Sequence, residues 1–597
     1  MLGGYRYPIV GPVRFSLVPS TVTQLVLGEP TKDAHPGVSV VVWKDWSGGF
    51  GQELLETTQP VDRSSWSELN GSTKGHLVMP NLATQTAAGA AAAVGIINEY
   101  ASVIYAAFGT DLRTYAVDTW TNVRTLAAAA TDSINIYLGG TEYLVIAQGT
   151  DYDYWNGAAW ARSTKDTRHL AFWDERLWGI NFDGQLWWST TLGTEVNDAQ
   201  LQLPAGHVTS LFVARAADGE LRIHCGTTKG LYVHDLDNKR FVETELVLPL
   251  HTQNGLGAKA WRSSIYFPAG LSLLQYVARG SEAVIRNIGP NRDGGVPTDR
   301  TGQIILTLGT VNELLAVVSG GASADASILA WDEKGWQCRW IDNGGFTIST
   351  AHVSNAYSSY RLWWAYNNRV YWMTLPREIT NPEQLTGQTY QAGSLEHYTP
   401  WFDAGERNVN KTGIRILLEA GAGESSGSIA TAYAVNGSSS YTALGSITSA
   451  GVGFTSYSFP NNTFPRAGVE FRSIRFRWIV TRGTTNTLTP DIRHVEFFFQ
   501  KKLPPRWHFD IVVDLDRPEY GGLSREQRFD RLVSAIQSST LLEFTFRNRD
   551  SNEASELDPY NYYVTVDHAE GQQFTGNEWT GKMALRLTEK SSVPTIL

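Results

Sequence analysis

Ser102-Val-Ile-Tyr-Ala-Ala-Phe-Gly-Thr-Asp111 and Glu142-Tyr-Leu-Val-Ile-Ala-Gln-Gly-Thr-Asp151 are two copies of one pattern. In each copy a run of apolar, β-branched and aromatic residues ends in Gly-Thr-Asp, and an aromatic residue, Tyr115 or Tyr154, follows a few residues later. Such runs favour strands, and the glycine supplies the positive φ that a tight hairpin turn requires. Each copy therefore predicts two antiparallel strands joined by a short turn.

The pattern recurs along the chain at a spacing of roughly 35 to 50 residues, which is typical of one four-stranded propeller blade per repeat. Single blades cannot bury both faces, so they stack in a ring. We therefore predict a β-propeller over residues 91–376 with about seven blades, six and eight being the alternatives. The weaker copies are Arg176-Leu-Trp-Gly-Ile-Asn-Phe-Asp-Gly184, Leu221-Arg-Ile-His-Cys-Gly226, Ser264-Ile-Tyr-Phe-Pro-Ala-Gly270, Ile328-Leu-Ala-Trp331 and Tyr360-Arg-Leu-Trp-Trp-Ala-Tyr-Asn-Asn368.

Tryptophan is concentrated in the repeat region, which holds 14 of the 21 in the chain. Large rings of this kind fill the wedge between neighbouring blades, so we interpret them first as core. Trp187, Trp336 and Trp363 are expected to be mostly buried. The alternative is an exposed platform on which sugar rings stack.

Composition excludes several classes of protein. A net charge of −10 argues against a general nucleic-acid binder. Cys225 and Cys338 are too few for a disulfide framework or a conventional zinc site, and we interpret both as small buried side chains. Residues 1–20 lack the features of a signal peptide, and the longest apolar run, 87–97, is too short to span a bilayer. We expect a soluble protein made in a cytoplasm.

The segment before the repeats, residues 1–90, has short strand-like patches and one distinctive stretch, Trp43-Lys-Asp-Trp-Ser-Gly-Gly-Phe-Gly-Gln52. Its glycines permit close approach of the backbone. Trp43, Trp46 and Phe50 are therefore a candidate assembly anchor that docks on another subunit. The alternative is that this segment supplies the last strand that closes the ring.

The chain after the repeats predicts three further parts. Residues 377–398 are polar and predict a linker. Residues 399–503 contain short strand-like runs and predict a β-sandwich; in one of these runs Ile474, Phe476 and Trp478 alternate with arginines. Residues 504–597 predict a small α+β domain. Its helix starts with a capping box formed by Ser524 and Gln527. The predicted fold class is therefore mainly β and multi-domain.

No catalytic motif for nucleotide, serine-nucleophile or zinc chemistry is present. Asp151 and Asp153 are a candidate acid/base or calcium pair, although residues of this kind more often cap a hairpin turn, and Asp183 lies in an incomplete Asp box. His224 and His234 bracket a predicted hairpin and are candidates to face one another. We therefore predict no catalytic, cofactor-binding or metal site, and no enzyme activity.

The order of parts resembles the tail and tail-tip (baseplate or nozzle-like) structural proteins of double-stranded DNA bacteriophages. The resemblance implies a virion protein that forms a symmetric oligomer with other tail proteins, with host surface polysaccharide or a receptor as a further partner. No functional residue is carried over from that family. The phrases that carry the resemblance are Trp46-Ser-Gly-Gly-Phe50, Phe471-Arg-Ser-Ile-Arg-Phe476, Leu488-Thr-Pro-Asp-Ile492, Leu541-Leu-Glu-Phe-Thr-Phe546 and Tyr562-Tyr-Val-Thr-Val-Asp567.

Three function classes follow from these observations. A structural component of the virion tail, made in the host cytoplasm, agrees with the many small β modules and the missing catalytic motifs. A carbohydrate-binding or receptor-binding propeller requires aromatic rings exposed in a groove. A propeller glycoside hydrolase requires two carboxylates that converge in the central channel.

Overall fold

The computed structural model divides the chain into two compact units, residues 40–499 and residues 1–39 with 500–597. No helix among its described residues has the length and apolar content needed to cross a membrane. The described residues are 6–8, 14–18, 25–26, 38–55, 61–280, 282–320, 325–342, 344–377, 388–421, 427–448, 453–459, 468–501, 506–514, 524–537, 542–546, 560–570 and 582–591.

Seven propeller-like sheets of four antiparallel strands follow one another along the chain, so the predicted mainly β class is confirmed. The first three sheets contain β8 (Val94–Tyr100), β9 (Val103–Phe108), β10 (Asp111–Ala116) and β11 (Thr119–Thr125), then β12 (Asp132–Leu138), β13 (Thr141–Ala147), β14 (Tyr152–Trp155) and β15 (Trp160–Ser163), then β16 (His169–Trp173), β17 (Arg176–Ile180), β18 (Gln185–Thr191) and β19 (Thr194–Gln200).

The remaining four sheets have the same order of strands, except that the last takes a strand from the N-terminal segment. They contain β20 (Val208–Arg215), β21 (Leu221–Thr227), β22 (Gly230–Asp235) and β23 (Arg240–Val247), then β24 (Lys259–Trp261), β25 (Ser264–Ala269), β26 (Ser272–Arg279) and β27 (Glu282–Asn287), then β28 (Gln303–Gly309), β29 (Leu314–Ser319), β30 (Ser327–Trp331) and β31 (Trp336–Ile341), and finally β32 (Ile348–Ser354), β33 (Arg361–Tyr366), β34 (Arg369–Thr374) and β7 (Thr84–Gln85).

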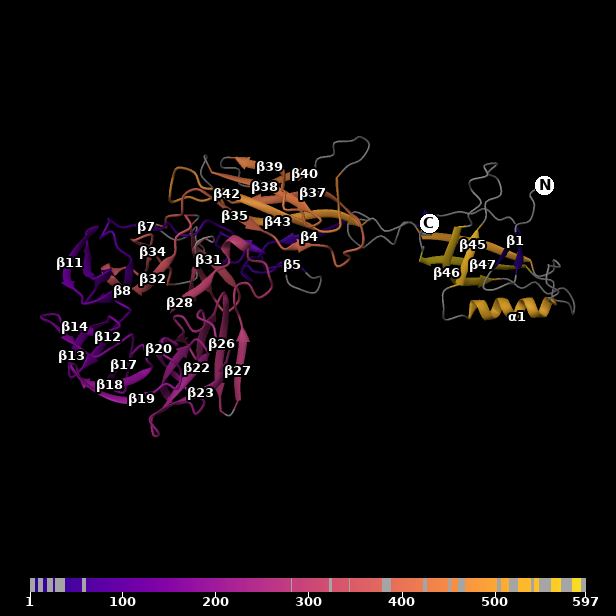
Figure 1. The fold of residues 1–597 in the computed structure, drawn as a ribbon. Helices are drawn as coiled ribbons and strands as arrows, with labels where there is room; N and C mark the ends of the chain where they lie inside the picture. The colour runs from indigo at the N-terminus through magenta and orange to yellow at the C-terminus, as the bar shows by residue number, and fades with distance from the viewer. Residues whose placement is uncertain are drawn as a thin grey trace. The chain divides into compact units, whose positions relative to one another are not determined.

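The first strands of successive sheets contact one another from β8 to β32, and β32 in turn contacts β8, so the series of contacts returns to its start. In Figure 1 the sheets follow one another from indigo β8 to salmon β34. The short strand β7 pairs with β34 and completes the sheet that lies next to β8. Segments nearly 300 residues apart in the chain therefore share one sheet.

The hairpin turns use the residues that the sequence pattern indicated. Gly109, Gly184 and the Asn367-Asn368 pair all have positive φ, as a tight turn between antiparallel strands requires. The tryptophan prediction is also confirmed, because Trp187, Trp336 and Trp363 are all almost fully buried.

Two larger sheets in residues 40–499 pack on one aromatic core, where the rings of Phe476 and Phe497 lie 5.0 Å apart. One holds β39 (Thr442–Thr448), β38 (Ser428–Val435), β42 (Ile474–Thr481), β35 (Ser394–Tyr398), β36 (Trp401–Phe402), β6 (Trp66–Ser67) and β5 (Leu54–Leu55), and the other holds β4 (Ser39–Trp43), β43 (Ile492–Lys501), β37 (Lys411–Ala420), β40 (Gly453–Ser458) and β41 (Val469–Phe471).

The predicted domain boundaries require two corrections. The segment 377–398, predicted to be a linker, contains β35, which pairs with β42 and with β6. The segment 1–90 is not one arm, because β4, β5 and β6 belong to the two larger sheets whereas β7 belongs to the seventh small sheet. Both results depend on pairing between distant strands, which local composition does not specify.

The second unit is built from both ends of the chain. Its sheet has the order β1 (Arg6–Pro8), β2 (Arg14–Val18), β44 (Arg506–Asp514), β47 (Lys582–Ser591), β46 (Tyr560–Glu570) and β45 (Leu542–Phe546), with β3 (Leu25–Val26) also paired to β44.

The predicted helix of the second unit is present as α1 (Arg525–Ile536), and Ser524 and Gln527 form the predicted capping box. The helix residue Leu532 belongs to the same buried hydrophobic cluster as Ile511, Val513 and Leu585 of the sheet. The hydrophobic cluster of this unit therefore contains residues from α1 and from the strands that follow position 500.

Candidate functional site

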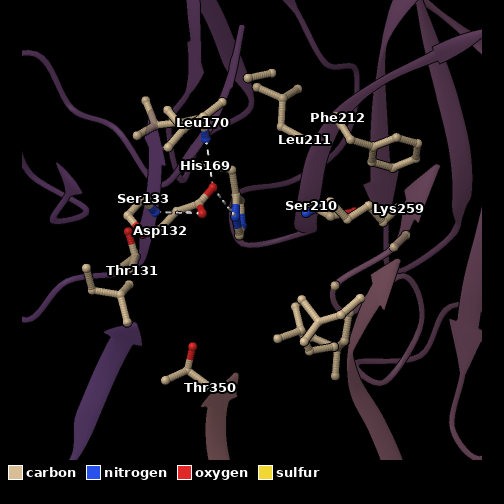
Figure 2. Close-up of a pocket in the computed structure, with 18 of the residues that line it drawn as sticks. Thr131, Asp132, Ser133, His169, Leu170, Ser210, Leu211, Phe212, Lys259 and Thr350 are labelled. Atoms are coloured by element: carbon tan, nitrogen blue, oxygen red, sulfur yellow. Dashed lines mark hydrogen bonds and ion pairs between the residues drawn. The ribbon is translucent and has the colours of Figure 1, made fainter. Parts of the chain in front are cut away.

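A cavity of about 510 Å³ lies where the first strands of the seven small sheets meet. Its wall is polar on several strands and apolar on others. Figure 2 shows Asp132 and His169 on one side, with Ser210 and Lys259 across from them. The lining residues used below are Ile96, Thr131, Asp132, Ser133, Arg168, His169, Lys259, Ile305, Leu306, Thr350 and His352.

Asp132 is the acidic side chain of this wall. Its carboxylate accepts hydrogen bonds from the backbone N–H groups of Ser133 at 2.7 Å and Leu170 at 2.9 Å, and its Oδ2 lies 3.8 Å from His169 Nδ1. Burial raises the pKa of Asp132 to about 6, even though these hydrogen bonds and the charge of Lys259 favour the ionised form. The carboxyl group therefore changes charge just below neutral pH.

Two histidines of the cavity are held in the neutral form. Burial lowers the pKa of His169 to about 3, with the charge of Arg168 acting in the same direction. Burial likewise lowers the pKa of His352 to about 4, assisted by Lys259. Both imidazoles are therefore uncharged near pH 7.

The permanent charges of the cavity are two cations. Neither Arg168 nor Lys259 forms an ion pair with a carboxylate among the described residues of the chain. The Arg168 guanidinium carbon lies 5.2 Å from the centre of the Phe182 ring, and burial lowers its pKa. With Asp132 ionised, the cavity carries one net positive charge, although the whole chain is acidic.

The sequence patterns did not single out this cavity. Asp132, His169 and Lys259 all lie on the first strand of a repeat. They stand six, four and two positions before the last residue of their strands, so an alignment of the repeats on their hairpins does not superpose them. That the strands bring them to one cavity depends on how the sheets contact one another.

The candidate anchor residues lie inside the same unit of the chain. Trp43, Trp46 and Phe50 are each 1% exposed and belong to the core shared with the larger sheets. The Phe50 N–H donates to the Trp336 carbonyl at 3.0 Å, and a Cβ on Gly49 would lie 2.4 Å from the Trp336 backbone. The stretch does dock, as its glycines indicated, but on the sixth small sheet of its own chain, so these rings are not available to a neighbour.

Asp151 and Asp153 do not form an acid/base pair. Burial favours the neutral form of Asp153, but hydrogen bonds from Arg162 at 2.5 Å and Arg124 at 2.9 Å outweigh it and hold its pKa below the usual value. Burial raises the pKa of Asp151, partly offset by Arg162. Since Arg124 lies in β11 and Arg162 in β15, the cluster joins the first and second sheets and is structural.

Asp153→Asn is expected to lower the free energy of unfolding at pH 7 by about 1–3 kcal/mol, because an amide leaves two arginines without their counter-ion. The folded pKa of Asp153 is lowered, so its contribution is complete above the unfolded pKa of about 3.9 and is lost as the pH falls through the folded value.

Denaturant unfolding between pH 7 and pH 3 measures this effect, with the exposed Asp183→Asn as the matched control. The stability difference should shrink toward pH 3. A difference that stays constant with pH would contradict the ion-pair explanation.

The histidine prediction is wrong. In the register of β21 and β22, His224 lies opposite Val233, so His224 and His234 project from opposite faces of the sheet. His234 Nε2 lies 2.8 Å from Asp198 Oδ1, whereas His224 Nδ1 lies 3.0 Å from the Arg222 carbonyl oxygen.

The two cysteines are buried and unpaired, as expected. Burial raises the pKa of both thiols, that of Cys338 to about 12, so neither is a thiolate near neutral pH. Among the described residues no three His, Cys, Asp or Glu side chains group in a way that could hold a metal ion.

Comparisons with known proteins do not assign a family. No family model matches the chain, and no curated protein matches it. Solved structures share 11–15% identity and TM-scores of 0.34–0.39 with it, values too low to identify a function.

Three of these structures illustrate the range of similarity. The extracellular domain of the putative hybrid two component system BT4673 from B. thetaiotaomicron has 15% identity and a TM-score of 0.39, over 53% of this chain and 45% of that one. The computationally designed Ika8 protein has 11% identity and a TM-score of 0.34, over 50% and 100%. BBS1N in complex with ARL6DN has 11% identity and a TM-score of 0.38, over 51% and 98%. The chain thus spans less than half of the first of these structures.

Proposed function

We propose that this chain is a structural subunit of a bacteriophage tail, at the tail tip, baseplate or nozzle, and that it assembles with other tail proteins into a symmetric oligomer. In this proposal the seven small sheets form a closed β-propeller, the two larger sheets form a β-sandwich fixed to it, and the second unit is an α+β domain. The phage assignment rests on the sequence resemblance.

One observation carries the structural role: the two ends of the chain pair in one sheet and form a compact unit of their own. Strands β2 and β3 both pair with β44, so neither end completes this sheet alone. Residues 40–499, in contrast, form the other compact unit and bury the candidate anchor in a hydrophobic cluster that includes both larger sheets. A compact unit that has its own hydrophobic cluster is suited to contact another subunit.

A catalytic role finds less support. The acid pair of Asp151 and Asp153 is engaged by Arg124 and Arg162. The cavity offers one carboxyl group, Asp132, whereas glycoside hydrolysis by the usual route uses two. Release of reducing sugar from host envelope polysaccharide, abolished by Asp151→Asn or Asp183→Asn, would contradict this part of the proposal.

Removal of residues 1–39 together with 500–597 is expected to leave a folded body that no longer joins the virion. This deletion keeps the buried residues of the 40–499 unit. Removal of residues 1–52 would instead delete the buried Trp43, Trp46 and Phe50 and is expected to unfold that unit. Circular dichroism and thermal unfolding report folding, and quantitative mass spectrometry of purified virions reports incorporation.

The full chain and a surface variant, Lys334→Met, are the matched controls and should both incorporate normally. If the shortened chain incorporates at the copy number of the full chain, the second unit is not the assembly surface and the proposal is wrong. Electron microscopy of the particle then locates the chain and shows whether it forms a ring.

A further inference from the structure

We propose that the cavity at the meeting point of the seven first strands binds a small acidic sugar, that is, a carboxylate carried on a hydroxylated ring. This binding function goes beyond the structural role and does not depend on it. The argument uses the size of the cavity, its charge and the chemistry of its walls.

The size and the mixed wall are those of a ligand site. A volume of about 510 Å³ lies within the range of roughly 300–1,000 Å³ that is typical of small-molecule pockets. Ile305 and Leu306 of β28 and Ile96 of β8 supply apolar surface, whereas other strands supply hydroxyl and charged groups. Such a wall fits a ligand that has both an apolar ring face and polar substituents.

The charge of the cavity selects an anion. Arg168 and Lys259 have no carboxylate partner among the described residues, and the carboxyl group of Asp132 is occupied by two backbone N–H groups. The two cations minus one ionised Asp132 leave one net positive charge, which a single carboxylate neutralises. His169 and His352 add no charge near pH 7 because both have strongly lowered pKa values.

Hydroxyl groups around the cavity favour a sugar over a bare anion. The Ser133 hydroxyl accepts a hydrogen bond from Asn98 at 3.1 Å and keeps its own proton to donate. The Thr350 hydroxyl also lines the cavity, and no hydrogen bond of this hydroxyl is found within the described part of the chain. Both lie on the wall with the cations, so they can bind ring hydroxyls while Lys259 and Arg168 bind the carboxylate.

The proposal makes binding pH-dependent in a defined direction. The charged or titratable groups that face the cavity are Asp132, Arg168, His169, Lys259 and His352. Between pH 7.5 and 5.5 only Asp132 changes charge, since its pKa is about 6 and those of the histidines lie well below. Protonation of Asp132 removes a negative charge next to the ligand, so binding should tighten as the pH falls.

Isothermal titration calorimetry on the full chain tests the proposal, with D-glucuronate and D-galacturonate as probes. Neutral D-glucose and inorganic phosphate are the comparison ligands. We expect a uronate to bind at least about tenfold more tightly than either comparison ligand, because only the uronate uses both the cations and the hydroxyls. Phosphate binding as tight as uronate binding would mean a general anion site and would overturn the sugar assignment.

The variants separate the cavity from the rest of the surface. Lys259→Met is expected to weaken uronate binding by about tenfold or more, whereas Lys334→Met, an exposed lysine in a turn outside the cavity, should have no effect. Asp132→Asn should tighten binding at pH 7.5 and remove the pH dependence. Unchanged thermal midpoints show that each variant is folded.

Two further results would reject the proposal. Either uronate fails to bind at millimolar concentration, or it binds equally well to Lys259→Met. Both are measured on the purified protein without any particle, so failure here is independent of failure of the assembly proposal.

Discussion

Phe50→Ala is expected to lower the free energy of unfolding of the 40–499 unit by about 3–5 kcal/mol, the usual cost of deleting a buried aromatic ring. The ring is 1% exposed and packs edge-on against Trp66, with ring centroids 4.7 Å apart. Its backbone N–H is bonded to Trp336 of the sixth small sheet. The substitution keeps this backbone bond but opens a cavity in the hydrophobic cluster that the sixth small sheet shares with the larger sheets.

Phe454→Ala is the matched control, because Phe454 lies in β40 with 60% of its surface exposed. Its effect should stay within about 0.5 kcal/mol, as for most surface substitutions. Calorimetric unfolding of the two variants beside the unsubstituted protein measures the difference. An effect of Phe50→Ala as small as that of Phe454→Ala would show that the ring is not part of the core.

Arg300→Leu is expected to cost about 3–5 kcal/mol at pH 7.5, because it leaves the buried carboxylate of Glu68 without its cation. Arg300 Nη2 lies 2.9 Å from Glu68 Oε1, and its Nη1 donates to the Asp342 carbonyl at 3.0 Å. Glu68 also accepts from the backbone N–H of Glu396 in β35. Through these bonds Glu68 of the N-terminal segment is connected to Asp342, which follows β31 of the sixth small sheet, and to β35 of a larger sheet.

The pH dependence of this variant follows from the direction of the Glu68 pKa. Burial raises that pKa, with the charge of Arg300 as the largest opposing effect. Because its folded pKa is raised, Glu68 favours folding in its protonated form. This contribution of Glu68 to stability is complete below the unfolded pKa of about 4.3 and is lost as the pH rises through the folded pKa. Without Arg300 the folded pKa rises further, and the deficit of the variant should shrink from pH 7.5 to pH 5.

Two companion variants sharpen this test. Adding Glu68→Gln to Arg300→Leu should recover part of the lost free energy of unfolding at pH 7.5, because the neutral amide does not need a cation beside it. Arg240→Leu, which breaks the exposed pair of Arg240 with Asp235, should cost about 1 kcal/mol or less. If Arg300→Leu lowers the free energy of unfolding by the same amount at pH 5 and at pH 7.5, an unpaired carboxylate of Glu68 is not the cause.

The sequence by itself determined the local elements of this protein. Three local features were predicted correctly. They are the hairpins whose turns contain Gly109 and Asn368, the burial of Trp187, and the helix capped by Ser524. Each depends on residues close together in the chain: turn residues that adopt positive φ, alternating apolar side chains, or a cap and its partner three positions later. The number of sheets follows from counting such units.

Only the tertiary structure decided which distant residues meet. Gln52 forms a bridge with Asp293, and β2 pairs with β44 across almost the whole chain. The aromatic residues near Gly49 looked like an anchor for a neighbour, because composition shows that a segment can dock but not on which surface. The cavity around Asp132 depends on the same kind of contact, since strands far apart in the sequence contribute its cations and its carboxyl group.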